Sequence, residues 1–350
     1  MRKAMKTLLI ILAVVAVVAI TAMLVLRHPA FGRRMSAERK ARIEASSKYR
    51  DGMFQNEEPT PQFSRSMPAM LWDFITNPPK DRTPKEPLPA VKTDLKNLPT
   101  DRDWLVWFGH SSYLFCLNGK HYLVDPLLKM EFPASVMMKP FAGTDIYTPD
   151  DMPDIDVLII THEHWDHLDY ATLRDLRPKV SYVICALGVA EYLEYWKYDK
   201  AIITEMDWYE KVSGITCLPT RHFSNRLIGG RNQTLWAAFM VEDVGRKVYI
   251  GGDGGYDGRF KRVREQFGQV DLALLENGQY NNDWPLIHST PEGLEHAILD
   301  LQAKAVFTVH HDKFALAKHP WSEPEQLVQS FAAHHPIHLL DQPIGTVVEF

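Results

Sequence analysis

The sequence predicts an α/β protein in which two β-sheets are sandwiched between helices, preceded by one N-terminal transmembrane helix. Two observations predict the sandwich: β-rich runs alternate with segments of helical spacing, and this arrangement occurs twice along the chain. A third, an uncharged apolar run near the N-terminus, predicts the membrane span. The chain has 350 residues, 45% of them hydrophobic and 24% charged, which excludes a disordered, collagen-like or coiled-coil protein.

The membrane span is predicted within residues 1–27. Residues 7–26 carry no charge, and at about 1.5 Å per residue they form a helix of about 30 Å, which is the thickness of the hydrocarbon core of a bilayer. The basic residues before the span also suit a signal peptide, but no clear A-x-A cleavage site precedes Arg27. We therefore expect an uncleaved, single-pass anchor in the cell membrane. Basic residues flank the span on both sides, so the positive-inside rule leaves the side of the body open.

Residues 28–100 are expected to connect this anchor to a catalytic domain at residues 101–350 and to pack on that domain. The segment is first basic and then rich in proline, and nine of the 23 prolines in residues 59–99 exclude long helices and central strands there. Residues 36–48 are charged and predict either an amphipathic helix at the membrane surface or a solvated segment. Contact with the body is expected from Trp72, Phe74 and Ile75.

The catalytic domain is predicted to begin with strands and then to alternate strands with helices. Strands are expected at residues 104–108, 113–117, 121–125, 156–160, 181–185, 213–218, 234–241, 246–251, 271–275, 305–309 and 345–349. Helices are expected near residues 170–176, 189–195, 258–266 and 291–301.

Charge and cysteine usage exclude two classes of protein. The 28 basic and 42 acidic side chains of residues 51–350 give this part a net charge of −14, so we expect no nucleic-acid partner. Cys116, Cys185 and Cys217 lie far apart with no C-x-x-C pair, which excludes a disulfide scaffold or a cysteine-rich zinc module.

A cluster of metal-binding residue types follows the expected strand at residues 156–160. It reads H-x-H-x-D-H and consists of His162, His164, Asp166 and His167. On a strand or loop, alternate residues point to one side, and the last two can turn toward a second centre. Imidazole and carboxylate groups suit zinc, and also iron or manganese. Histidine is scarce, so we interpret this density as a metal site and not as surface histidines in a loop.

Two metal ions need further ligands, and the candidates lie downstream at the ends of expected strands. They are His222, Asp253 within a Gly-Gly-Asp-Gly-Gly stretch, and His310. Each alone is more typical of a cap or turn residue. Together with the first cluster they complete two sets of ligands that share one aspartate.

This motif order resembles the metallo-β-lactamase superfamily over residues 100–350, and the resemblance implies a four-layer αββα sandwich with a dinuclear site. The segments at residues 107–111, 124–126, 235–236, 252–256 and 310–316 resemble the branch that contains N-acylphosphatidylethanolamine-hydrolysing phospholipase D and its bacterial relatives. The resemblance implies that one metal is held by His162, His164 and His222. It implies that the other is held by Asp166, His167 and His310, with Asp253 bridging the two.

The same resemblance implies roles for residues around the metals. Asp166, Asp253 and His288 are the expected catalytic residues, since a histidine close to the site occupies the position of His288 in that branch. Asp125 would orient a ligand or the metal-bound water, and His110 would pack or hydrogen-bond beneath the site. Residues 275–280 differ from the more apolar stretch expected of the phospholipase, and this difference bears on the substrate.

The expected activity is hydrolysis by a hydroxide that bridges two divalent ions, most simply Zn²⁺ with Fe or Mn as alternatives. The expected substrate is a phosphodiester such as N-acylphosphatidylethanolamine, because a membrane anchor would hold the body near lipid headgroups. The apolar side chains of residues 127–147 would either meet an acyl chain or pack as an ordinary loop. Two alternatives stay open: a lactonase or other hydrolase of a small-molecule ester, and a membrane-anchored metal-binding protein without catalysis. A homodimer is the default expectation for the body.

Overall fold

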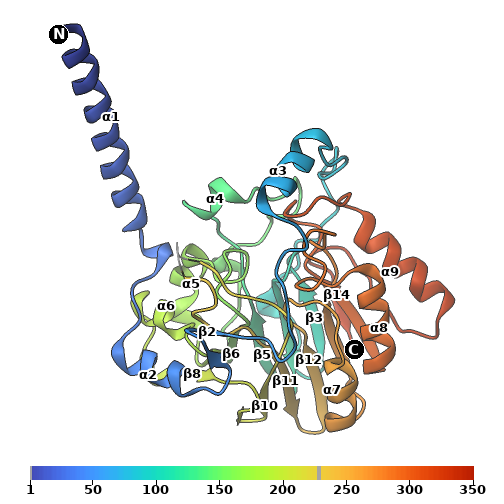
Figure 1. Cartoon of the computed structure of the whole chain (residues 1–350). Helices are drawn as coiled ribbons and strands as arrows, with labels where there is room; N and C mark the ends of the chain where they lie inside the picture. Colours follow the sequence, from blue (N-terminus) through green and yellow to red (C-terminus); the bar gives the residue numbers. More distant parts are fainter. Residues whose placement is uncertain (1, 227–229) are drawn as a thin grey trace.

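Two β-sheets face one another with helices on their outer sides, so the predicted αββα sandwich is confirmed (Figure 1). The computed structural model describes residues 2–226 and 230–350, and within them one sheet has seven strands and the other six. The first sheet has the order β15-β3-β4-β5-β6-β7-β8, and the second has the order β14-β13-β12-β11-β10-β9. A short hairpin of β1 and β2 lies outside both sheets.

The first sheet consists of β3 (Trp104–Trp107), β4 (Tyr113–Leu117), β5 (Lys120–Val124), β6 (Val157–Ile160), β7 (Val183–Ala186), β8 (Ile203–Met206) and β15 (Val347–Glu349). The second consists of β9 (Lys211–Val212), β10 (Ile215–Leu218), β11 (Ala238–Asp243), β12 (Arg246–Ile250), β13 (Leu272–Glu276) and β14 (Ala305–Val309). The hairpin strands are β1 (Tyr49–Arg50) and β2 (Met53–Phe54). The α-helices are α1 (Arg2–Leu26), α2 (Ala37–Ala45), α3 (Met67–Thr76), α4 (Ala134–Met137), α5 (Tyr170–Leu176), α6 (Ala190–Tyr195), α7 (Arg259–Phe267), α8 (Pro291–Leu301) and α9 (Glu323–His334).

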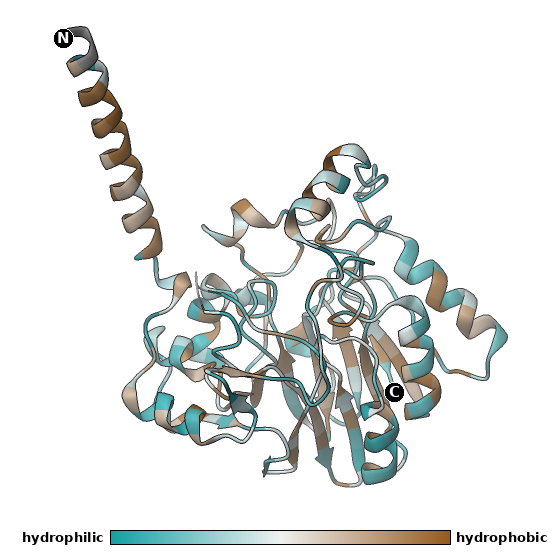
Figure 2. Cartoon of the chain, viewed as in Figure 1, coloured by the Kyte–Doolittle hydropathy of each residue, from teal (hydrophilic) through white to brown (hydrophobic). Residues whose placement is uncertain are grey.

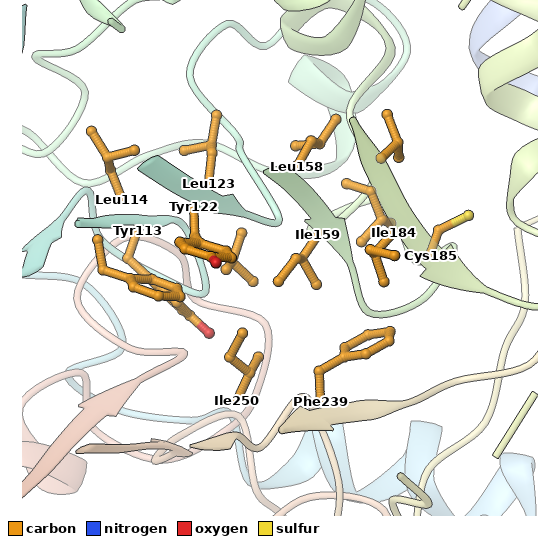
Figure 3. Packing of buried hydrophobic residues seen from close by; sticks show 14 of the residues in the cluster. Tyr113, Leu114, Tyr122, Leu123, Leu158, Ile159, Ile184, Cys185, Phe239 and Ile250 are labelled. Atoms are coloured by element: carbon orange, nitrogen blue, oxygen red, sulfur yellow. The ribbon is translucent and has the colours of Figure 1, made fainter. Parts of the chain in front are cut away.

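The core between the sheets is built from alternate strand residues. Tyr113 and Ile159 point from the first sheet toward Phe239 and Ile250 of the second (Figure 3), and all four are at most 2% exposed. Alternation along a strand sends the neighbouring residues to the opposite face, where helices cover them. On the second sheet that outer cover is made by α7, α8 and α9. Burial on both faces explains why the central strands are almost wholly apolar.

Strand direction determines where the functional residues gather. Strands β5, β6, β7 and β8 run parallel to one another, as do β12, β13 and β14. Parallel neighbours end at the same edge of a sheet, and ligands bind outside the carboxyl ends of such strands. The loops that follow β5, β6, β12 and β14 therefore meet at one edge of the sandwich.

The N-terminal helix α1 extends away from the body and is apolar along most of its length (Figures 1 and 2). Met5–Leu26 is long and apolar enough to cross a membrane, and no part of that segment is buried against the rest of the chain. This makes α1 a candidate membrane anchor, as the sequence predicts, and a signal sequence near the N-terminus would pass the same test of length and composition.

Helix α2 is anchored to the body, whereas residues 36–48 were expected to lie on a membrane or in solvent. The guanidinium of Arg39 is 7% exposed and forms ion pairs with Glu191, Glu194 and Glu205. Ile43, one turn later, is buried in the main core. Four residues separate these two side chains, so they share one face of the helix and fix it to α6 and β8.

Helix α3 exposes the aromatic and aliphatic side chains that the sequence predicts to pack on the body. Trp72, Phe74 and Ile75, which predicted contact with the body, are 70%, 45% and 64% exposed. The body is instead contacted by Met70, which is buried, and by Asp73, whose carboxylate lies 3.0 Å from Nζ of Lys318. The sequence analysis does not predict several elements of the structure, which are β1, β2, β8, β9, α3, α4 and α9.

Candidate metal centre

The residues of the H-x-H-x-D-H motif follow β6 directly and lie beside residues from three other chain segments. Asp253 comes after β12, His310 after β14 and His222 after β10. The glycines around Asp253 have a structural reason. Gly252 has φ of +60°, and a Cβ there would lie 2.6 Å from the carbonyl oxygen of Ala237, so the backbone passes where no side chain fits.

The first of the two expected ligand sets is brought together. Nδ1 of His164 lies 2.9 Å from Nε2 of His162 and 3.1 Å from Nε2 of His222. The Nδ1 atom of His222 is 2.7 Å from the carbonyl oxygen of Ile287, so its N–H donates there and leaves Nε2 with a lone pair. Three ring nitrogens therefore converge in the arrangement that a single cation needs.

The second set is also brought together and includes Asp253. Oδ2 of Asp253 lies 3.1 Å from Nε2 of His167 and 3.3 Å from Nε2 of His310. Asp166 Oδ2 is 3.6 Å from the same nitrogen of His167. The same Asp253 oxygen is 3.8 Å from Nε2 of His222, which belongs to the first set. Asp253 thus stands between the two sets.

Buried polar atoms in this centre lack hydrogen-bond partners among the described residues. They are Nε2 of His167, Nε2 of His310 and Oδ2 of Asp253. Such atoms are costly to bury unless a ligand satisfies them. Their convergence, and the presence of both imidazole and carboxylate groups, fit divalent metal ions.

Electrostatics in the centre keep most of its histidines neutral. Burial lowers the pKa of His162, His222 and His310 well below its usual range, and lowers the pKa of His164 to about 3. A neutral imidazole has the lone pair that a metal requires. Burial alone would also lower the pKa of His167, but the surrounding carboxylates, with Asp253 foremost, raise it well above the usual value. Burial raises the pKa of Asp253 to about 6, with the nearby Glu276 carboxylate adding to the effect.

Asp125 contacts Nδ1 of His167, the ring nitrogen other than the one that faces Asp253. Its carboxylate accepts hydrogen bonds from Nδ1 of His167 at 2.7 Å and from the backbone N–H of Thr161 at 2.8 Å. It therefore holds the ring so that Nε2 points toward Asp253, as an outer carboxylate does for a metal-ligating histidine.

His110 contacts one residue from each of two candidate ligand segments, Asp166 and His310. Its Nε2 donates to Asp166 Oδ2 at 2.8 Å, and its ring lies 4.1 Å from the ring of His310. Next to it, the Oγ of Ser111 lies 2.8 Å from Nδ1 of His310. Donation from Nδ1–H to this oxygen would leave the lone pair of Nε2 of His310 for a metal, so the contact suits a positioning role for Ser111.

Three residues of the centre have left-handed backbone conformations. The φ angles are +53° at His110, +39° at Asp125 and +76° at His310. Residues with side chains adopt such angles uncommonly, and they keep them where the surrounding structure holds the backbone in place. No pattern in the sequence indicates these conformations.

His288 faces the cavity and is held by a carboxylate that the sequence analysis did not assign. Nδ1 of His288 donates to Oε1 of Glu276, at the end of β13. The other oxygen of Glu276 accepts from the backbone N–H of Gly254 at 2.7 Å. Glu276 lies in residues 275–280, the stretch that departs from the phospholipase pattern. Its position at the carboxyl end of a buried parallel strand is the signal that could have identified it.

A cavity of about 250 Å³ opens beside these residues. One wall carries the centre, with His164, Asp166, Asp253, His288 and His310. The rest of the lining is mainly apolar and consists of Phe63, Phe223, Trp284, Ile287 and Leu316, with the polar Gln62 and Gln279. A small group of polar side chains within an apolar cavity is typical of a site for a small molecule or part of a lipid.

The fold and these clusters define a metal-dependent hydrolase scaffold, and comparison with known families supports this class. The family described as "Beta-lactamase superfamily domain" matches residues 120–311, more than half of the chain. An uncharacterised protein of Mycobacterium tuberculosis is 32% identical over 320 residues, which cover 87% of this chain and 84% of that protein. The chain therefore belongs to the metallo-β-lactamase superfamily of metal-dependent hydrolases.

For a relative with a named activity, the match covers a smaller share of both proteins. N-acyl-phosphatidylethanolamine-hydrolyzing phospholipase D 1 of Caenorhabditis elegans is 30% identical over 202 residues, 51% of this chain and 54% of that protein. Among solved structures, a metallo hydrolase of Ignicoccus hospitalis has a TM-score of 0.52 at 19% identity, covering 71% of this chain and 98% of the other. The diiron β-hydroxylase CmlA of Streptomyces venezuelae has a TM-score of 0.55 at 19% identity, covering 76% and 55%. These two likenesses concern the fold.

Proposed function

We propose that this chain is a membrane-anchored, dinuclear-metal hydrolase of phosphodiesters that acts on N-acylphosphatidylethanolamine. The observation that carries the proposal is the convergence of two sets of buried ligand atoms on the carboxylate of Asp253. One set is His162, His164 and His222, and the other is Asp166, His167 and His310. Two ions held there, most simply zinc, would activate water near neutral pH and stabilise charge on the attacking and leaving oxygens.

The protein's own residues orient the reaction. Asp125 holds the ring of His167 with Nε2 toward Asp253, and His110 holds the carboxylate of Asp166, which lines the cavity. His288 lines the cavity and its Nδ1–H is engaged by Glu276, which leaves Nε2 to contact a phosphoryl oxygen or to pass a proton to the leaving oxygen.

Three observations support a lipid phosphodiester as the substrate. A relative with this activity aligns over half of the chain. The candidate span α1 would hold the body at a membrane. Apolar side chains make up much of the cavity lining beside the histidines, which suits the acyl chain of a lipid headgroup amide.

The test is hydrolysis by the full-length chain in detergent. We expect chelator-sensitive conversion of N-acylphosphatidylethanolamine to phosphatidic acid and N-acylethanolamine. The variant Asp253→Asn should lose this activity while keeping its thermal unfolding transition, and Asp154→Asn, which changes an exposed aspartate, is the matched control. Near-normal turnover by Asp253→Asn would contradict the dinuclear mechanism. Hydrolysis of bis-p-nitrophenyl phosphate or a lactone without lipid hydrolysis would reject the substrate, and bound metal with no hydrolysis of any ester would favour a non-catalytic metal-binding protein.

A further inference from the structure

Helix α3 directs most of its apolar side chains to solvent and its charged side chain toward the body. Four of its apolar side chains are more than 60% exposed, namely Met67, Leu71, Trp72 and Ile75, while Asp73 pairs with Lys318 of the body. A surface helix of a soluble protein places its apolar stripe inward. Large contiguous apolar patches on a surface mark sites of interaction.

Helix α4 has a similar exposed apolar surface. Val136 is 76% exposed, Met137 is 53% exposed, and Phe132 just before the helix is 45% exposed. The opposite side of this segment packs inward through Ala134 and Met138. We call the exposed apolar side chains of α3 and α4 the apolar rim.

The two helices of the apolar rim stand beside the entrance of the site cavity. Leu316 lines the cavity and packs against the cluster that holds α4. Lys318, two residues later, forms an ion pair with Asp73 of α3. Phe63, three residues before the N-cap of α3, also lines the cavity. The loop at residues 316–318 therefore contacts α3 and the cluster that holds α4, and it also lines the cavity.

The end of the candidate membrane span is fastened next to the apolar rim. His28 makes an edge-to-face contact with Phe132, with ring centroids 5.5 Å apart. The carbonyl oxygen of Pro29 accepts a hydrogen bond from Nε1 of Trp196 at 2.8 Å, which fixes this segment to the body. Only two residues separate His28 from Leu26, where α1 ends, so at about 3.5 Å per residue the span ends within about 7 Å of His28 along the chain.

We infer that the apolar rim docks into the lipid bilayer that α1 crosses, with the entrance of the site cavity facing the membrane. An inserted α1 ends at the bilayer surface, and the contact of His28 with Phe132 then places α4 at that surface. Figures 1 and 2 show α3 and α4, both largely apolar, on the side of the body from which α1 extends. The inference rests on the proposed membrane anchoring but not on the proposed substrate.

Contact with a bilayer would explain why the apolar side chains of both α3 and α4 face outward. Trp and aliphatic side chains that insert at the level of the headgroups are typical of proteins that lie on a membrane surface. A lipid could then move from the bilayer into the cavity without exposing its acyl chains to water. A second copy of the chain is the competing occupant of the rim, and the experiment separates the two.

The experiment places a fluorescent probe on the full-length chain in lipid nanodiscs that hold one chain each. Leu71→Cys and Val136→Cys carry the probe on the rim, and Val244→Cys is the control, because Val244 is 83% exposed in the turn between β11 and β12. The three native cysteines are buried and would not react. The discs contain phosphatidylcholine with brominated acyl chains as the quencher.

We expect brominated lipid to remove most of the fluorescence at positions 71 and 136 and almost none at 244. Equal quenching at all three positions would overturn the inference. In a parallel set of discs that hold two chains each, shielding of the probes at 71 and 136 from water without quenching by lipid would also overturn it and assign the rim to a second copy. This readout needs no turnover, so loss of the proposed lipid activity and failure of docking are distinguishable.

A second measurement compares Leu71→Glu/Val136→Glu with Val244→Glu. The double variant should lose most of its hydrolysis of N-acylphosphatidylethanolamine in vesicles but keep that of soluble bis-p-nitrophenyl phosphate, while Val244→Glu keeps both. Full lipid hydrolysis by the double variant, in a chain that does hydrolyse the lipid, would contradict docking through the rim.

Discussion

Oδ2 of Asp125 accepts a hydrogen bond from Nδ1 of His167 at 2.7 Å and another from the hydroxyl of Thr161 at 2.5 Å. Two donors on one oxygen leave the carboxylate little freedom to rotate. The ring of His167 is thereby fixed with Nε2 directed at Asp253. The residue after β5 therefore holds two residues of the loop after β6 in place, so the packing of these strands sets the position of a candidate metal ligand.

The first prediction concerns this contact. Asp125→Ala should lower the affinity for the ion beside His167 by about 10–100-fold, because an unsupported imidazole rotates away and becomes less basic. The ion in the other set should be much less affected. Competition with a chromogenic chelator measures both affinities in one titration. Two unchanged affinities in a folded variant would show that Asp125 has no positioning role.

The strand pattern and the ligand cluster could be predicted from the sequence because both are local. The run at residues 157–160 is apolar throughout, and the motif that follows it is compact in the chain. The contact of Glu276 with His288 was missed, since it joins the ends of separate segments. From composition alone, a charged helix is expected to face solvent and an aromatic one to face the core. The burial of Arg39 and the exposure of Trp72 differ from this expectation because they depend on the parts of the body that each helix contacts.

The second prediction concerns the helix after the anchor. Arg39→Met should lower the free energy of unfolding by about 3 kcal/mol, because it removes the only buried cation of the cluster. Glu191 then keeps only the half-exposed Arg33, and Glu205 keeps only Arg42 at 3.8 Å. Lys40→Met is the matched control. Lys40 is exposed and lies 3.7 Å from Glu44, so its loss should change stability by at most about 0.5 kcal/mol. Chemical denaturation measures both, and equal effects of the two substitutions would refute a structural role for the buried cluster.

The third prediction is a pH dependence of stability. Lys313 is buried, and burial lowers its pKa to about 8. Its pKa in the unfolded chain is about 10.4, so between these values the unfolded state binds more protons than the folded state. This group therefore makes stability rise with pH from about 8 to about 10. In Lys313→Met that contribution should be absent, so the stability difference between wild type and variant should change across this window. A constant difference measured by urea denaturation at pH 7.5 and 10 would contradict the buried-cation account.

The fourth prediction concerns Glu276. Glu276→Gln should lower kcat by about 10²-fold, because an amide holds the His288 ring less firmly and replaces a charge beside the cavity. Metal content should stay unchanged, which distinguishes this effect from loss of a ligand. His288→Ala should lower kcat by a similar factor, and combining the two changes should add little. Independent, multiplying effects of the two substitutions would show that they do not act together.

The central claim is that two ligand sets, sharing Asp253, each hold one ion. The most direct measurement is the metal content of the purified full-length chain beside His222→Ala and His310→Ala, each of which removes a nitrogen from a different set. We expect about two divalent ions per wild-type chain and about one in each variant, as in other two-metal sites. A wild-type chain without tightly bound metal, or variants that retain both ions, would contradict the claim.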